Sequence, residues 1–147
     1  SLSAEKNQSI NGSVKEALRL GCTAIGFTIY PGSEYQYDMF EEFKEISREA
    51  SSHGLPSVLW SYPRGESISK DGETSIDIIG YAAHIAALLG AHIIKVKPPT
   101  ANVEQSSCKE LYKREKLEIS NLSARIKHIK TIPIKLGPPS INLVFNS

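Results

Sequence analysis

The strongest constraint on the fold is a regular alternation of apolar runs with amphipathic segments. Apolar runs of strand length begin at Ala24, Ser57 and His92, so that successive starts lie 33 and 35 residues apart. Between them, apolar residues recur at helical spacing among charged residues, and glycine ends each segment at Gly54 and Gly90. This pattern predicts repeated βα units and therefore an α/β protein.

Local signals place the individual elements. Ser13 and Glu16 match a capping box, which predicts the start of a short helix ending at Gly21. The apolar runs are expected to be parallel strands buried on both faces, and residues 64–73 to form a long polar loop. The other expected elements are strands at 24–30, 57–62, 92–97 and 141–145, helices near 38–53 and 75–89, and one or two helices between 103 and 129.

Two architectures share this alternation, a (β/α)8 barrel and an open doubly wound sheet. A full barrel has roughly 250 residues, about 31 for each unit, so the spacing fits a barrel while 147 residues hold about four units. Residues 30–33 lack the Gly-x-Gly-x-x-Gly turn of dinucleotide-binding sheets. We therefore expect residues 1–147 to form a single α/β domain, a partial (β/α)8 TIM barrel of about four βα units with parallel strands.

Composition narrows the possible partners. The net charge is +1, from 17 basic and 16 acidic residues spread along the chain, which disfavours nucleic acid and membrane surfaces as partners. No apolar run reaches the length of a membrane span, and Cys22 and Cys108 lack the spacing of metal ligands or of a disulfide framework. The four histidines are scattered among different elements. We expect a cytoplasmic protein that acts on a small molecule without a metal or another cofactor.

The candidate chemistry lies where the strands end, because the carboxyl edge carries the active site in parallel barrels. Side chains alternate along a strand, so Lys95 and Lys97 share one face of their strand, and Trp60 and Tyr62 share one face of theirs; these could be the inward faces. A lysine among apolar residues tends to lose its proton, and the neutral amine can form an imine with a ketone. Tyr62 could then transfer protons, and Trp60 could form a wall of the pocket.

Each of these residues also has a purely structural interpretation. A lysine at a strand end often extends into solvent along its apolar stem. Trp60 and Tyr62 are common core aromatics, and Arg64 could be an ordinary loop cation.

Three strand-end motifs together resemble a known family. Residues 28–33 (Thr-Ile-Tyr-Pro-Gly-Ser), 60–65 (Trp-Ser-Tyr-Pro-Arg-Gly) and 94–97 (Ile-Lys-Val-Lys) closely resemble the archaeal- and bacterial-type class I fructose-bisphosphate aldolases, in the same order and at similar spacing. The resemblance runs from about residue 13 to residue 129. It implies that the chain is the central part of a TIM-barrel aldolase.

The resemblance also implies roles for single residues. Lys95 would form the imine with dihydroxyacetone phosphate or fructose 1,6-bisphosphate, and Tyr62 would be the proton donor. Trp60, Arg64 and Lys97 match positions that line the substrate site in that family. No metal or organic cofactor is implied. The family's catalytic aspartate from an early strand and its glycine-rich phosphate-binding strand ends have no counterpart in this chain.

The implied activity is reversible cleavage of fructose 1,6-bisphosphate into dihydroxyacetone phosphate and glyceraldehyde 3-phosphate, a lyase reaction of glycolysis and gluconeogenesis. The full-length parent is expected to be a homo-oligomer, and the isolated chain to have weak or no activity. Two alternatives stay open: a related Schiff-base barrel enzyme acting on another phosphorylated keto compound, and a non-catalytic remnant of a truncated aldolase.

Overall fold

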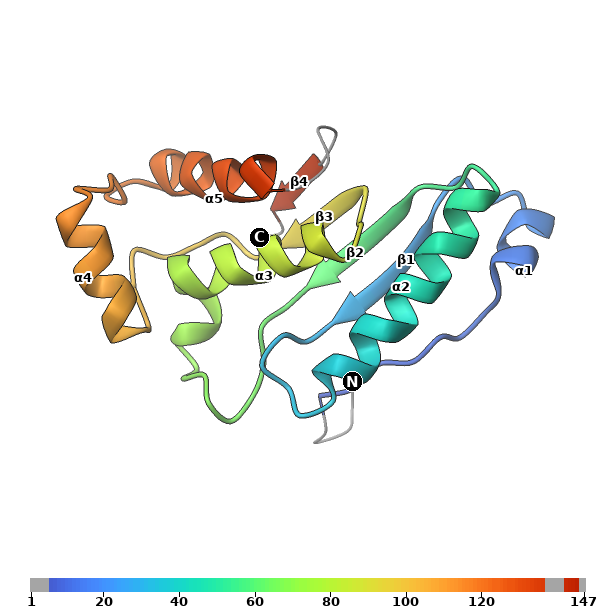
Figure 1. Cartoon of the computed structure of the whole chain (residues 1–147), viewed down its shortest axis with the longest axis horizontal. Helices are drawn as coiled ribbons and strands as arrows, with labels where there is room; N and C mark the ends of the chain where they lie inside the picture. Colours follow the sequence, from blue (N-terminus) through green and yellow to red (C-terminus); the bar gives the residue numbers. More distant parts are fainter. Residues whose placement is uncertain (1–5, 137–141, 146–147) are drawn as a thin grey trace.

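The computed structural model describes residues 6–136 and 142–145, which form one parallel sheet with helices packed along it (Figure 1). Within these ranges no helix has both the length and the apolar character that a membrane crossing requires. The elements in chain order are α1 (Val14–Arg19), β1 (Ile25–Ile29), α2 (Gln36–Ser52), β2 (Ser57–Ser61), the 3-10 turn η1 (Gly72–Thr74), α3 (Ile76–Leu88), β3 (Ile93–Val96), α4 (Ser106–Arg114), α5 (Leu122–Leu136) and β4 (Asn142–Phe145).

The strands lie side by side in the order in which they occur along the chain. Their order is β1-β2-β3-β4, and each pairs in parallel with the next. A barrel is wound in this sequential way, whereas a doubly wound sheet reverses direction at a switch point. The prediction of a partial (β/α)8 barrel with four parallel strands is therefore confirmed.

The helices cover one face of this sheet (Figure 1). Phe27, Leu59 and Ile94 occupy matching positions on β1, β2 and β3, and all three are buried toward the helices. The ring of Phe43 on α2 lies 6.1 Å from that of Phe27. Ser61 donates a hydrogen bond to the carbonyl of Ala82 on α3 at 2.9 Å, which fixes that helix against β2.

The expectation that the strands are buried on both faces is wrong for the described chain. Along β1, buried residues alternate with exposed or half-buried ones, and Gly26 on the second face is exposed. Apolar runs alone do not reveal which side a helix covers. In a barrel the uncovered face points inward and is closed only by a full ring of strands, so we call it the inner face.

The capping box and the helices predicted between residues 103 and 129 are confirmed. Ser13 and Glu16 form the expected capping box, in which the Glu16 N–H donates to the Ser13 hydroxyl at 3.1 Å. The segment between residues 103 and 129 contains two helices, α4 and the first part of α5. Strand β4 begins at Asn142, while residues 137–141, which include the expected Gly-Pro-Pro turn and the start of the last strand, lie outside the described residues.

Candidate active site

Lys95 and Trp60 meet on the inner face of the sheet. They are paired in register between β3 and β2, and Thr28 of β1 is the next residue in the same row. The Nζ atom of Lys95 lies 5.6 Å from the centre of the Trp60 ring, a cation–π distance. Both side chains are half-buried. The amine of Lys95 therefore lies against an aromatic wall.

The indole of Trp60 has room because a glycine faces it. A Cβ atom built on Gly26 would lie 2.5 Å from Cζ3 of that ring, closer than real Cβ contacts come. A glycine in a strand interior often marks such a close approach. Gly26 therefore leaves the space on β1 into which the ring of Trp60 packs.

Tyr62 lies just beyond β2, where the ladder with β1 continues. Its backbone N–H donates to the carbonyl of Ile29 at 3.1 Å, and two residues later the N–H of Arg64 donates to the carbonyl of Pro31 at 3.0 Å. The alternation of side chains therefore extends past the strand and puts Tyr62 on the same face as Trp60. The register of β2 with β3 puts Lys95 on that face as well.

Two glycines bring the loops after β1 and β2 into close contact. Gly65 has a φ of 155°, and a Cβ atom there would lie 1.9 Å from the carbonyl oxygen of Gly32, which itself has a φ of 95°. Only glycine fits both requirements without a shift of backbone. The contact fixes the loop that carries Arg64.

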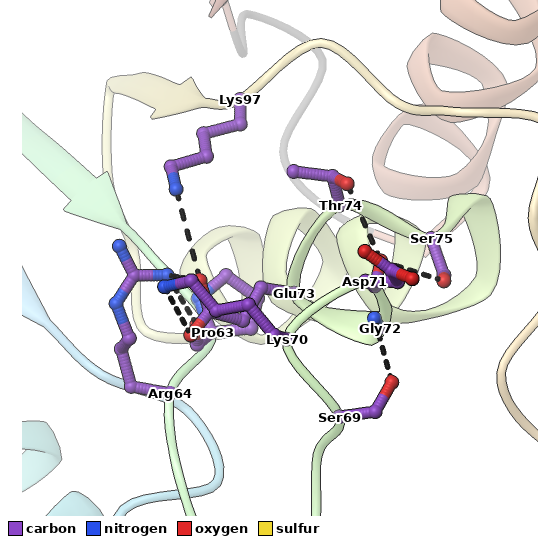
Figure 2. Close-up of polar contacts among 10 residues, drawn as sticks. All are labelled: Pro63, Arg64, Ser69, Lys70, Asp71, Gly72, Glu73, Thr74, Ser75 and Lys97. Atoms are coloured by element: carbon purple, nitrogen blue, oxygen red, sulfur yellow. Dashed lines mark hydrogen bonds and ion pairs between the residues drawn. The ribbon is translucent and has the colours of Figure 1, made fainter.

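A buried carboxylate, Glu73, collects the cations at this edge of the sheet (Figure 2). It lies in the 3-10 turn before α3, and its Oε2 accepts a hydrogen bond from Nη1 of Arg64, with which it forms an ion pair. The Nζ atoms of Lys70 and Lys97 lie 3.2 Å and 3.9 Å from the same oxygen. The side chain of Glu73 is only 12% exposed, against 85% for Lys70. Arg64 and Lys97, two of the predicted substrate-binding residues, thus converge on one carboxylate.

The electrostatics of Lys97 reflect this crowding. Partial burial of the ammonium group lowers the pKa of Lys97, and the neighbouring Arg64 guanidinium lowers it further. The Glu73 carboxylate acts in the opposite direction, and the more exposed Lys70 adds a smaller lowering effect. The site is therefore a cationic cluster that one carboxylate compensates only in part.

The loop that carries Glu73 is tied to the loop after β3. Glu104 accepts hydrogen bonds from the backbone N–H and the hydroxyl of Ser69, both at 3.0 Å, and these bonds lower the pKa of Glu104. Asp77 of α3 in turn accepts from the backbone N–H groups of Glu104 and Gln105 at 3.0 and 2.9 Å. The carboxyl-end loops form one connected layer above the sheet.

Sequence reasoning missed Glu73. Glu73 lies 12 residues after the end of β2, in the stretch predicted to be a polar loop, and no periodicity links it to the face of a strand. The loop holds three acidic residues, Glu66, Asp71 and Glu73, so its composition did not single out Glu73. Elsewhere, the described residues contain no group of three or more His, Cys, Asp or Glu side chains that could hold a metal ion.

Comparison with known proteins identifies the family. A model of the DeoC/LacD family aldolases matches residues 2–126, and the chain belongs to this family. The class 1 fructose-bisphosphate aldolase of Thermoproteus tenax is 51% identical over 87 residues, which make up 59% of this chain and 32% of that protein. The fructose-bisphosphate aldolase/6-deoxy-5-ketofructose 1-phosphate synthase of Methanocaldococcus jannaschii is 44% identical over 97 residues, 66% of this chain and 31% of that protein.

A solved structure of a Schiff-base-forming fructose-1,6-bisphosphate aldolase aligns with 97% of this chain at a TM-score of 0.62 and 32% identity. The chain covers 59% of that structure and about a third of the two relatives named above. The described sheet is thus similar to part of a Schiff-base aldolase.

Proposed function

We propose that this chain carries the imine-forming part of a class I fructose-bisphosphate aldolase, with Lys95 as the nucleophile. The observation that carries the proposal is that Lys95 lies beside Trp60 on the inner face, with Tyr62 two residues further along the chain, just beyond β2. The named aldolases that the chain resembles support the same reaction.

The proposed reaction begins when the uncharged amine of Lys95 attacks the C2 ketone of the bound sugar phosphate. A carbinolamine forms and loses water to give an iminium ion. The positive nitrogen accepts the electron pair of the C3–C4 bond as that bond breaks, so an enamine forms in place of a free carbanion. Protonation of the enamine and hydrolysis then release dihydroxyacetone phosphate and restore the amine.

Tyr62 moves the protons in this scheme. The phenol of Tyr62 would donate its proton to the carbinolamine hydroxyl as water leaves, and the resulting phenolate would accept the proton of the C4 hydroxyl as the aldehyde leaves. The re-formed phenol would then protonate the enamine. Trp60 forms the apolar wall beside the imine. Arg64 and Lys97 supply positive charge for the anionic part of the substrate.

Imine trapping on the 147-residue chain tests the proposal. The chain is incubated with dihydroxyacetone phosphate, reduced with borohydride, digested and analysed by mass spectrometry. We expect a covalent adduct on the peptide that contains Lys95, and none on Lys95→Arg, which keeps the charge but cannot form a stable imine. An adduct confined to Lys97, or no adduct on a folded sample, would refute the assignment. Steady-state cleavage by the isolated chain is expected to be weak.

A second substrate is favoured by one observation. The Methanocaldococcus relative is named for both an aldolase and a 6-deoxy-5-ketofructose 1-phosphate synthase activity. The same imine lysine could act on another phosphorylated keto compound, and trapping with each ketone in turn distinguishes the two.

With fructose 1,6-bisphosphate as substrate, we further propose that the full-length parent works in glycolysis and gluconeogenesis in the cytoplasm, as a homo-oligomer.

A further inference from the structure

Glu73 has an unusual position for a charged residue. Its side chain is only 12% exposed, and it belongs to the short turn Gly72–Thr74, which lies between the loop after β2 and helix α3. Its carboxylate reaches Arg64 from one loop and Lys97 from the end of β3, two segments that are otherwise separate in the chain (Figure 2). One buried anion thus joins the carboxyl ends of two neighbouring strands.

The three ion pairs of Glu73 differ in how strongly water screens them. The Arg64 and Lys97 side chains are 21% and 33% exposed, so their attraction to Glu73 is only partly screened by water. Lys70 is largely in solvent, and an ion pair of that kind contributes little. Without the carboxylate, the two partly buried cations would repel each other and separate.

The carboxylate is not needed to build the turn in which it lies. The backbone N–H of Glu73 donates to the carbonyl of Ser69 at 3.1 Å, and that of Ser75 donates to Gly72 at 2.9 Å. The Gly72 N–H is bound by the Ser69 hydroxyl at 2.9 Å. Replacement of the carboxylate by an amide should therefore leave the turn folded and change mainly the cations.

We propose that Glu73 is a positioning residue of the aldolase site, holding Arg64 and Lys97 at the ends of β2 and β3 before the anionic substrate binds. This inference rests on the proposed function. Two cations share one carboxylate, so positive charge remains for a phosphate group, while the geometry of both side chains is already fixed. Glu73 itself does not touch the reacting atoms.

The first test follows the ammonium group of Lys97 by NMR titration in the 147-residue chain. Arg64, Lys70 and Glu73 are the charged groups that influence Lys97, and Glu73 alone of these raises its pKa. We expect Glu73→Gln to lower the titration midpoint of Lys97 and Glu73→Asp to restore part of the difference. Glu66→Gln, which removes the same charge from an exposed position in the same loop, should leave the midpoint unchanged.

The second test measures borohydride trapping of dihydroxyacetone phosphate as a function of its concentration. We expect Glu73→Gln to raise the half-saturating concentration about ten-fold with the same maximal adduct yield, because ground-state binding is weakened while the amine is intact. Glu73→Asp should lie between, and Glu66→Gln should match the wild type.

The two tests separate the two proposals. If the wild type forms no adduct, the proposed function fails, and binding of inorganic phosphate, read from the Arg64 and Lys97 resonances, decides whether Glu73 organises an anion site. An unchanged Lys97 midpoint in Glu73→Gln would overturn the positioning role. So would a folded Glu73→Gln variant whose maximal yield falls while its half-saturation stays the same, since that result indicates a general loss of active protein.

Discussion

The two ends of the sheet are built from different interactions. At the carboxyl end, Arg64 and Lys97 gather around the buried Glu73 with an excess of positive charge. At the amino end, the Ser47 and Ser57 hydroxyls lie 2.9 Å apart. The Ser57 hydroxyl also lies 3.0 Å from Nδ1 of His92, and the backbone N–H of Ser57 donates to the same nitrogen at 3.2 Å. One end carries unbalanced charge, and the other a short chain of hydrogen bonds without carboxylates.

The difference separates function from stability. Partly buried cations with one shared anion cost free energy, which a protein recovers only when an anionic ligand binds. Hydroxyls that satisfy one another in a buried place stabilise the fold without offering a binding site. Barrel enzymes divide their two ends in this way. The next predictions test whether the division holds here.

The largest effect is expected at Gly65, where the carboxyl-end loops touch. Gly65→Ala would place a methyl group 1.9 Å from the carbonyl oxygen of Gly32, and backbone has to move to admit it. We expect the free energy of unfolding to fall by about 3 kcal/mol, from overpacking together with backbone strain. Urea denaturation measures the loss, and imine trapping at Lys95 should weaken with it because Arg64 is displaced.

Gly54→Ala is the matched control for this substitution. Gly54 has a φ of 75°, but a Cβ atom there meets nothing within 4 Å. Its cost should be about 1 kcal/mol, from the left-handed backbone alone. Equal losses in the two variants would show that the contact between the loops of Gly32 and Gly65 does not matter.

A smaller effect is expected at the amino end. Ser57→Ala removes the partner of the Ser47 hydroxyl in a site where both residues are buried, and should lower the free energy of unfolding by about 1–2 kcal/mol. Adding Ser47→Ala should cost less than its effect alone, because no unpaired hydroxyl remains. Imine trapping should be unchanged in both variants. Reduced trapping with unchanged stability would contradict the division between the two ends.

The sequence predicted the elements that depend on periodicity. Alternation along β2 and β3 was enough to predict that Trp60 and Tyr62 share a face and to bring Lys95 into consideration, because strand geometry fixes direction at every second residue. The register that pairs Trp60 with Lys95 could not be derived, since it depends on how two strands separated by a helix align.

Other features had no local signal. Burial of only one face of the strands depends on the side along which the helices pack, and apolar runs look alike in either case. The role of Glu73 arises because a loop folds back over the ends of two strands. The contact between Gly32 and Gly65 is equally non-local. The roles of Lys95 and Tyr62 in chemistry stay predictions until trapping is done.

The smallest effect, absent at neutral pH, is expected where α4 packs on α5 beside the carboxyl-end loops. The hydroxyl of Tyr112 lies 3.0 Å from Nε2 of His128. Burial raises the pKa of Tyr112 to about 12, and the nearby Asp77 and Cys108 add to the effect. The phenol of the folded protein therefore keeps its proton in a range of pH where that of the unfolded chain has lost it.

The sign of the resulting pH dependence follows from linkage. A raised pKa in the folded state stabilises the fold fully below pH 10, the ordinary value for tyrosine, and this stability is lost as the pH rises toward about 12. Tyr112→Phe should therefore show a flatter decline of the urea midpoint over that interval than the wild type, and Tyr81→Phe, at an exposed site, should follow the wild type. Parallel curves for all three proteins would mean that Tyr112 is as open to solvent when folded as when unfolded. A flatter curve for Tyr112→Phe alone would show that deprotonation of Tyr112 contributes to the loss of stability in alkali.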